Sequence, residues 1–270
     1  MTDLFTVARA CIDSCTPDEK LALTYQTAAR WREAGYTLES ELPVDEIPVP
    51  GRPELPVLVA PGKVPRRRLG SPDGPAALVH AIAHIEFNAI NLAWDAVYRF
   101  RGMPREFYDG WVQVADEEAR HFALLRDRLR EMGHEYGDFD AHDGLWEMAC
   151  RTAHDVLIRM ALVPRVLEAR GLDVTPAMMQ RLKSIGDNRT VSILEVILKE
   201  EIGHVAIGTR WFRYACEQRG VDPDETFKEL VEEYMKGNVI GPFHEEARAE
   251  AGFSENEMNN LRKQAGIQKG

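Results

Sequence analysis

The amino-acid sequence predicts an all-α protein built around an antiparallel four-helix bundle with extra short helices. Four long segments repeat apolar residues every three to four positions, as amphipathic helices do. No segment alternates apolar and polar residues between turn signals in the manner of a β-strand. Two of the long segments are joined by only Gly102-Met103-Pro104, and so short a connection makes neighbouring helices antiparallel.

The N-terminal part is expected to contain two helices. The first is expected near residues 3–12. The second begins after a capping box formed by Thr16 and Glu19 and runs to about Gly35.

A proline-rich stretch follows these helices. Nine of the fifteen prolines fall between Pro43 and Pro75. Because proline and glycine interrupt regular structure, we expect this stretch to be a loop that wraps around the bundle. With the two helices before it, it forms an N-terminal extension over residues 1–74.

The bundle itself is expected over residues 75–219, and a C-terminal helical extension over residues 220–270. The helices of these two parts are expected at 75–101, 104–132, 144–170, 176–186, 188–219, 223–236 and 254–265.

Three of the long helices carry ionisable residues on their apolar faces. Glu86 shares a face with apolar residues three, four and seven positions away. Glu118 and His121 lie on such a face of the second long helix, and Glu201 and His204 on that of the last. A buried carboxylate without a partner is costly or takes up a proton, so these groups need a shared cation.

This pattern predicts a dinuclear metal site. Carboxylate-bridged bundles use one Glu from each of two helices and a Glu-x-x-His motif from each of the other two. The segments Glu118-x-x-His121 and Glu201-x-x-His204 supply both motifs, and Glu86 supplies one single Glu. Four carboxylates and two neutral imidazoles balance the charge of two divalent ions.

The fourth carboxylate is assigned from spacing. Each motif residue recurs 83 positions later, and 82 positions after Glu86 stands Glu168. Pro164 lies on the same face as Glu168. The helix is therefore expected to be kinked at Pro164 and to continue, interrupted, through residues 176–186, or else the assignment fails and Glu147 is the alternative.

Two acidic neighbours could replace a ligand. Glu117 and Glu200 each precede a motif glutamate. Glu117 faces Gln113 and is expected to be solvated, whereas the place of Glu200 stays open.

These ligand segments resemble those of the ferritin-like di-iron carboxylate superfamily. A closer likeness is carried by four further segments: His84-Ile-Glu86, Tyr136-Gly-Asp-Phe, His142-Asp-Gly-Leu-Trp146 and Glu168-Ala-Arg-Gly-Leu-Asp173. Through them the chain resembles, from about residue 10 to 260, an uncharacterised bacterial family of ferritin-like proteins filed as a domain of unknown function. A tRNA-modifying hydroxylase is similar in fold and ligands.

The resemblance implies a ferritin-like bundle and narrows the class. Radical-generating reductase subunits carry a tyrosine one turn beyond the first ligand histidine, whereas Leu125 and Gly208 stand at these positions here. Rubrerythrin-like peroxidases carry a C-x-x-C iron domain, which the sequence lacks.

The expected function is therefore a metal-dependent oxidoreductase that uses O2 or peroxide to oxidise or hydroxylate a small-molecule substrate. Two divalent ions are expected, with iron favoured and manganese the alternative, and no catalytic residue beyond the metal ligands. An electron donor and a homodimer are further expectations. The alternatives are a non-catalytic metal-binding or structural protein and a tRNA-modifying hydroxylase.

Composition limits the partners and the compartment. The 33 basic and 44 acidic residues give a net charge of −11, which disfavours nucleic acid. We expect no membrane span, since no apolar stretch approaches about 18 to 20 residues. The first residues lack the basic and apolar regions of a leader, and none of the four cysteines forms a C-x-x-C pair, so we expect a cytoplasmic protein.

Overall fold

The computed structural model describes residues 2–236 and 239–267, and no β-strand occurs among them. Among the described residues, two isolated β-bridges occur, one between Asp3 and Thr37 and one between Leu58 and Ala141. The predicted all-α class is confirmed. The chain divides into two compact units, Met1–Cys150 (unit 1) and Arg151–Gly270 (unit 2). The three-part division at residues 74 and 219 stays a prediction.

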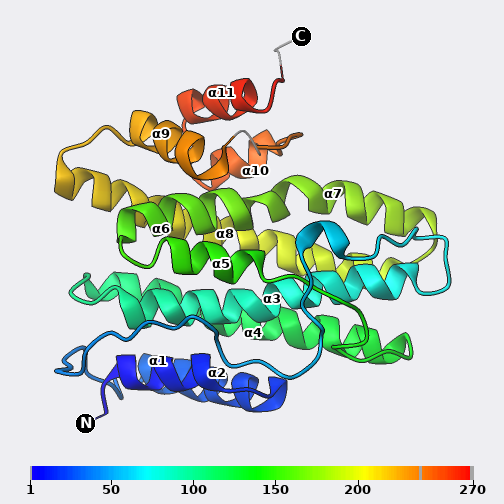
Figure 1. The fold of residues 1–270 in the computed structure, drawn as a ribbon, viewed down its shortest axis with the longest axis horizontal. Helices are drawn as coiled ribbons and strands as arrows, with labels where there is room; N and C mark the ends of the chain where they lie inside the picture. Colours follow the sequence, from blue (N-terminus) through cyan, green and yellow to red (C-terminus); the bar gives the residue numbers. More distant parts are fainter. Residues whose placement is uncertain (1, 237–238, 268–270) are drawn as a thin grey trace. The chain divides into compact units, whose positions relative to one another are not determined.

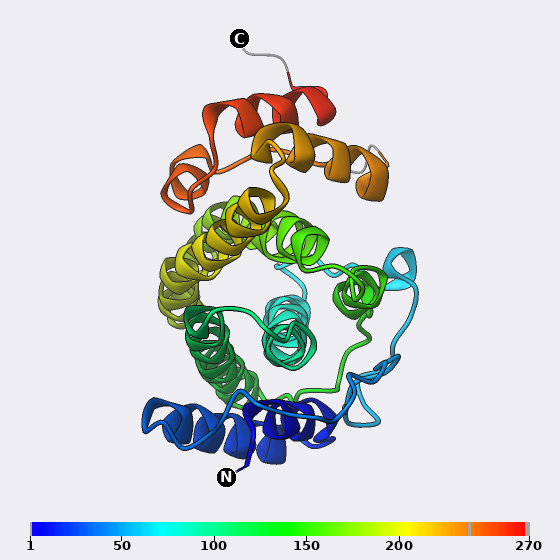
Figure 2. The same ribbon diagram turned by 90° about the vertical axis from the view of Figure 1, so that its left-hand side faces the viewer.

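Unit 1 is built on the antiparallel pair α3 (Gly74–Arg99) and α4 (Arg105–Glu131). Gly102, with φ of +78°, reverses the chain between them, a conformation that glycine adopts without strain. A second layer packs on this pair, as Figures 1 and 2 show: α1 (Leu4–Asp13) on α3 and α2 (Pro17–Arg32) on α4.

The start of α2 follows the predicted capping signal. The Thr16 hydroxyl accepts a hydrogen bond from the backbone N–H of Glu19 at 3.3 Å. The helix ends at Arg32 rather than near Gly35, because Ala34 already has the left-handed φ of 55°.

The proline-rich stretch is irregular apart from a 3₁₀ turn, Pro61–Lys63, and runs across unit 1. The backbone N–H of Gly51 donates to Ile12 in α1 at 2.8 Å. The indole of Trp146, in α5 (Gly144–Arg151), donates to the Ile47 carbonyl at 3.1 Å. These bonds tie the stretch to helices on either side of it in the sequence.

Helix α3 is long and apolar enough to cross a membrane, with a mean hydropathy of 1.2 over its most apolar 18 residues. The expectation that no stretch approaches a membrane span is wrong by this measure. However, 78% of that window is buried, as in the core helix of a soluble protein.

Unit 2 is built on a long interrupted helix that packs on α8 (Asn188–Arg219). The interrupted helix runs from α6 (Val156–Leu162) through a π-helical segment (Val163–Glu168) into α7 (Ala169–Ser184). Three shorter helices complete the unit (Figure 1): α9 (Pro223–Met235), α10 (Glu245–Glu250) and α11 (Glu255–Gln264).

Two predicted helix boundaries are wrong in this region. The helix expected at 144–170 is broken before α6, where the Asp155 carboxylate caps the new helix by accepting from the N–H of Leu157 at 2.8 Å. The expected gap between 170 and 176 does not exist, because α7 continues through Pro176 to Ser184. Pro164 lies within the π-helical segment, and the changed hydrogen-bond register there accommodates the missing donor without ending the helix. Helix α10 was not predicted.

Candidate metal centre

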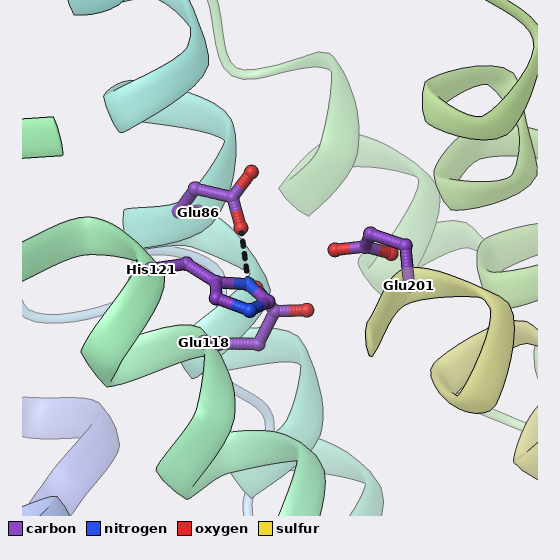
Figure 3. Close-up of side chains that lie close together, drawn as sticks. All are labelled: Glu86, Glu118, His121 and Glu201. Carbon is purple, nitrogen blue, oxygen red and sulfur yellow. Dashed lines mark hydrogen bonds and ion pairs between the residues drawn. The ribbon is translucent and has the colours of Figure 1, made fainter. Parts of the chain in front are cut away.

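Unit 1 brings three of the predicted ligands together. Figure 3 shows the side chains of Glu86, from α3, and of Glu118 and His121, from α4, pointing toward one another. Nδ1 of His121 lies 3.2 Å from Oε2 of Glu86 and 3.4 Å from Oε2 of Glu118. All three are buried, with no more than 3% of any residue exposed. We call them the unit 1 triad.

The sequence positions these groups through ordinary helix geometry. Glu118 and His121 are three residues apart, so they lie side by side on one face of α4. Apolar residues one turn away on the same faces, Ile90 in α3 and Phe122 in α4, are fully buried as well. The triad therefore lies in an apolar interior.

Burial and mutual charge perturb the triad strongly. Burial, together with the charge of Glu118, raises the pKa of Glu86 well above its ordinary value. Burial alone would lower the pKa of His121, but the hydrogen bonds and charges of Glu118 and Glu86 outweigh it and raise this pKa to about 11. The two carboxylates thus require a positive charge beside them, from a proton or from a cation.

The donor set fits a metal ion. Each member of the triad offers one ligand atom, and these atoms lie within 4.8 Å of one another. Carboxylate oxygen and imidazole nitrogen are ligands that first-row divalent ions such as iron and manganese accept. The buried cluster could therefore hold a metal ion.

Unit 2 carries the other predicted ligands. Glu201 and His204 lie on α8, with Nδ1 of His204 3.6 Å from Oε1 of Glu201. Both are buried, and so is Glu168 at the end of the π-helical segment. The alternative Glu147 is exposed on α5 in unit 1, and burial therefore favours Glu168 as the predicted fourth carboxylate.

The π-helical segment approaches α8 closely. A Cβ added to Gly208, one turn beyond His204, would lie 2.4 Å from the ring carbons of Pro164. Only glycine at this position allows the segment that ends in Glu168 to pack there.

The acidic neighbours of the motif glutamates are less buried. Glu117 and Glu200 are both half-buried. The side-chain amide of Gln113 donates to Glu117 at 3.0 Å, as the sequence suggested. These two carboxylates provide matched controls for Glu118 and Glu201.

A second polar group on α3 belongs to the packing of unit 1. His84 lies 2.8 Å from the Tyr136 hydroxyl through Nδ1 and 3.1 Å from the His142 carbonyl through Nε2. Asn91 accepts a hydrogen bond at 2.7 Å from the fully buried Lys20 of α2. Burial lowers the pKa of Lys20 to about 8. Sequence reasoning missed this lysine, because it directly follows the charged residues Asp18 and Glu19, which are exposed.

Comparisons with known proteins give a family but no activity. The family model described as "Protein of unknown function (DUF455)" matches residues 13–259. An uncharacterized protein of Haemophilus influenzae is 49% identical over 214 residues, which cover 77% of this chain and 74% of that protein. No solved structure matches the chain.

Proposed function

We propose that this chain, which belongs to the DUF455 family of proteins of unknown function, holds a dinuclear metal site. This site supports the oxidation of a small-molecule substrate by O2 or peroxide. The observation that carries the proposal is the unit 1 triad. Two carboxylates and an imidazole are buried within hydrogen-bonding distance of one another in an apolar interior. Two carboxylates in such a cluster need a positive charge beside them, and a bound metal ion would supply it.

Sequence symmetry extends this site to six ligands. Glu118 and His121 recur as Glu201 and His204 after 83 residues, and Glu86 has its counterpart in Glu168. Each of these groups is buried. By the ferritin-like ligand pattern that the sequence predicts, these six side chains would bind two divalent ions.

Iron is the proposed metal, with manganese as the alternative. Either ion would bring redox chemistry with O2 or peroxide to the site. The residues themselves hold the ions, and four carboxylates with two neutral imidazoles leave no net charge. Buried apolar side chains one turn from the ligands, such as Ile90 and Phe122, would exclude water from the oxidation.

Metal content tests the proposal directly. The protein, loaded anaerobically with Fe(II) and desalted, should retain two iron ions per chain by elemental analysis and consume O2 when air is admitted. Glu118→Gln and Glu201→Gln should each lose at least half of the iron and most of the O2 uptake. The adjacent changes Glu117→Gln and Glu200→Gln should retain both, because these side chains are half-buried neighbours rather than proposed ligands.

Three outcomes would contradict the proposal in different ways. Unchanged iron content in Glu118→Gln and Glu201→Gln would reject the ligand set. Iron bound without O2 uptake, and removed by a chelator with a large loss of thermal stability, would favour the non-catalytic structural alternative. Retention of tRNA at low salt would favour the hydroxylase alternative, against which the net charge of −11 argues. The electron donor, homodimer and cytoplasmic location stay predictions.

A further inference from the structure

Unit 2 contains a pocket that the proposed metal chemistry does not use. It lies between the π-helical segment, the first turn of α7 and the residues around α10, and encloses about 570 Å³ when its open side is counted. This volume is in the range of small-molecule sites. The pocket is lined by Arg165, Val166, Leu167, Arg170, Asp173, Met235, Val239, Ile240, Phe243, Arg248 and Leu261.

The first arginine of the pocket is fully buried. Nη2 of Arg165 donates to Oε1 of Glu257 at 2.6 Å, and Nε donates to the Thr209 hydroxyl at 3.1 Å. The guanidinium lies over the rings of Phe212, Phe227 and Phe253, at 4.1 to 4.6 Å from their centroids. Its remaining nitrogen, Nη1, is buried without a hydrogen-bond partner among the described residues.

The second arginine repeats this arrangement. Nε and Nη2 of Arg248 donate to the two carboxylate oxygens of Asp173 at 2.9 and 2.8 Å. Its Nη1 is likewise buried with no partner in the part of the chain that the structure describes. Two buried guanidinium groups of one pocket therefore each keep one donor nitrogen unused. Buried donors normally find an acceptor.

The charges around the pocket leave room for one anion. Among the side chains that line the pocket and their ion-pair partners, three are positive (Arg165, Arg170 and Arg248) and two are negative (Asp173 and Glu257), so the excess is one positive charge. Arg213, which also acts on Arg165, is exposed to solvent and lies outside the lining. A single carboxylate neutralises this excess, whereas the dianion of a phosphate monoester overcompensates it. Arginine also matches a carboxylate by donating two parallel hydrogen bonds.

The rest of the lining is apolar. Aliphatic and aromatic side chains supply most of the wall, and Ile240 is 64% exposed. We infer that the pocket binds a small organic monocarboxylate with an apolar body, whose carboxylate accepts from Nη1 of Arg165 and Arg248. The apolar body lies along Val166, Leu167 and Ile240. This assignment goes beyond the proposed metal function and does not depend on it.

Calorimetric titration of the whole, metal-free chain with octanoate at pH 7 tests the inference. Octanoate should bind once per chain, and octan-1-ol, with the same body and no charge, should bind about tenfold more weakly or worse. Octyl phosphate should bind more weakly than octanoate. If octanol binds as tightly as octanoate, the pocket recognises only the apolar body and the inference is wrong. If octyl phosphate binds more tightly than octanoate, the assignment to a monocarboxylate is wrong.

A filling variant locates the binding without disturbing either buried ion pair. Val166 is half-buried in the wall, so Val166→Phe occupies the pocket while both arginines keep their partners. It should abolish octanoate binding. Arg210→Gln removes an exposed arginine of α8 outside the pocket lining and should bind octanoate as the unchanged chain does. Full binding by Val166→Phe, or no binding by the unchanged chain, would overturn the inference.

Discussion

The two helix pairs that carry the predicted ligands follow the same sequence arithmetic but are built differently. In unit 1, Glu86 stands on an uninterrupted α3 and its partners on an uninterrupted α4. In unit 2, Glu168 ends a π-helical segment, and its predicted partners stand on α8. The residue that corresponds by this spacing to Glu86 of the regular helix α3 is therefore Glu168, which lies in an interrupted helix.

The groups that support the two pairs differ as well. Beside α3, unit 1 has a network of neutral polar groups in which His84 contacts Tyr136 and the His142 carbonyl. Beside the π-helical segment, unit 2 has the buried ion pair of Arg165 and Glu257 within a cluster of phenylalanine rings. A π-helical turn loses regular backbone hydrogen bonds, and side-chain contacts from distant elements hold it in place.

The two units should therefore lose stability in response to different changes. Removing a charge should affect unit 2 most, because its support is an ion pair without access to water. Acid should affect the support of unit 1, because its histidines are buried in the neutral form. A change of side-chain volume should be felt where the π-helical segment touches α8.

The largest effect is expected from Glu257→Gln in unit 2. Glu257 is fully buried, pairs with Arg165 at 2.6 Å and completes the capping box of α11 with Ser254. Its neutralisation leaves the Arg165 guanidinium buried without a counter-charge, which costs about 3–5 kcal/mol. The measurement is the free energy of unfolding in urea.

Glu255→Gln is the matched control on the same helix turn. Glu255 lies 3.9 Å from Arg262 and its side chain is 72% exposed, so its removal should change the free energy of unfolding by less than about 1 kcal/mol. Similar losses in both variants would show that the ion pair in the aromatic cluster has no special part in unit 2.

Acid should weaken unit 1 through His84. Burial lowers the pKa of His84 to about 4, although its hydrogen bond to the His142 carbonyl opposes this shift and the nearby Arg52 and His80 reinforce it. The unfolded chain, with an ordinary histidine pKa of about 6.5, therefore binds more protons between pH 6.5 and 4. Stability is fully present above pH 6.5 and falls as the pH drops toward 4, by up to about 3 kcal/mol.

Urea unfolding of His84→Gln at pH 6.5 and 4.5 measures this contribution. The variant should lose less stability than the unchanged chain over this range, although His80, whose pKa burial also lowers to about 4, continues to act. His154→Gln at an exposed position of unit 2 is the control, because it leaves the buried His80 and His84 of unit 1 in place. If His84→Gln loses as much stability in acid as the unchanged chain, the neutral form of His84 does not contribute to the acid sensitivity of unit 1.

The sequence predicts what local geometry determines. The unit 1 triad follows from helical spacing and apolar faces. Helix α8 has the predicted bounds 188–219, and in the structure Asp187 caps its start and the left-handed Gly220 ends it. The break before α6, helix α10 and the π-helical segment depend on packing between distant residues. Arg165 and Glu257 are 92 positions apart, and no spacing pattern announces their pairing.

The smallest of these effects tests the close approach of the π-helical segment in unit 2. Gly208 and Leu125 are equivalent by the 83-residue spacing, one turn beyond His204 and His121. Leu125 is fully buried in unit 1, whereas a Cβ at Gly208 would lie 2.4 Å from the ring of Pro164. Gly208→Ala should therefore cost about 1–3 kcal/mol of unfolding free energy, despite the higher helix propensity of alanine.

Gly203→Ala separates packing from propensity on the same helix. A Cβ at Gly203 meets nothing within 4 Å, so alanine there should stabilise the chain by up to about 1 kcal/mol. Opposite signs for the two substitutions in urea unfolding would locate the difference between the units at the contact of Pro164 with α8. If Gly208→Ala is as stabilising as Gly203→Ala, the π-helical segment can move away without loss, and the glycine is not what holds Glu168 in position.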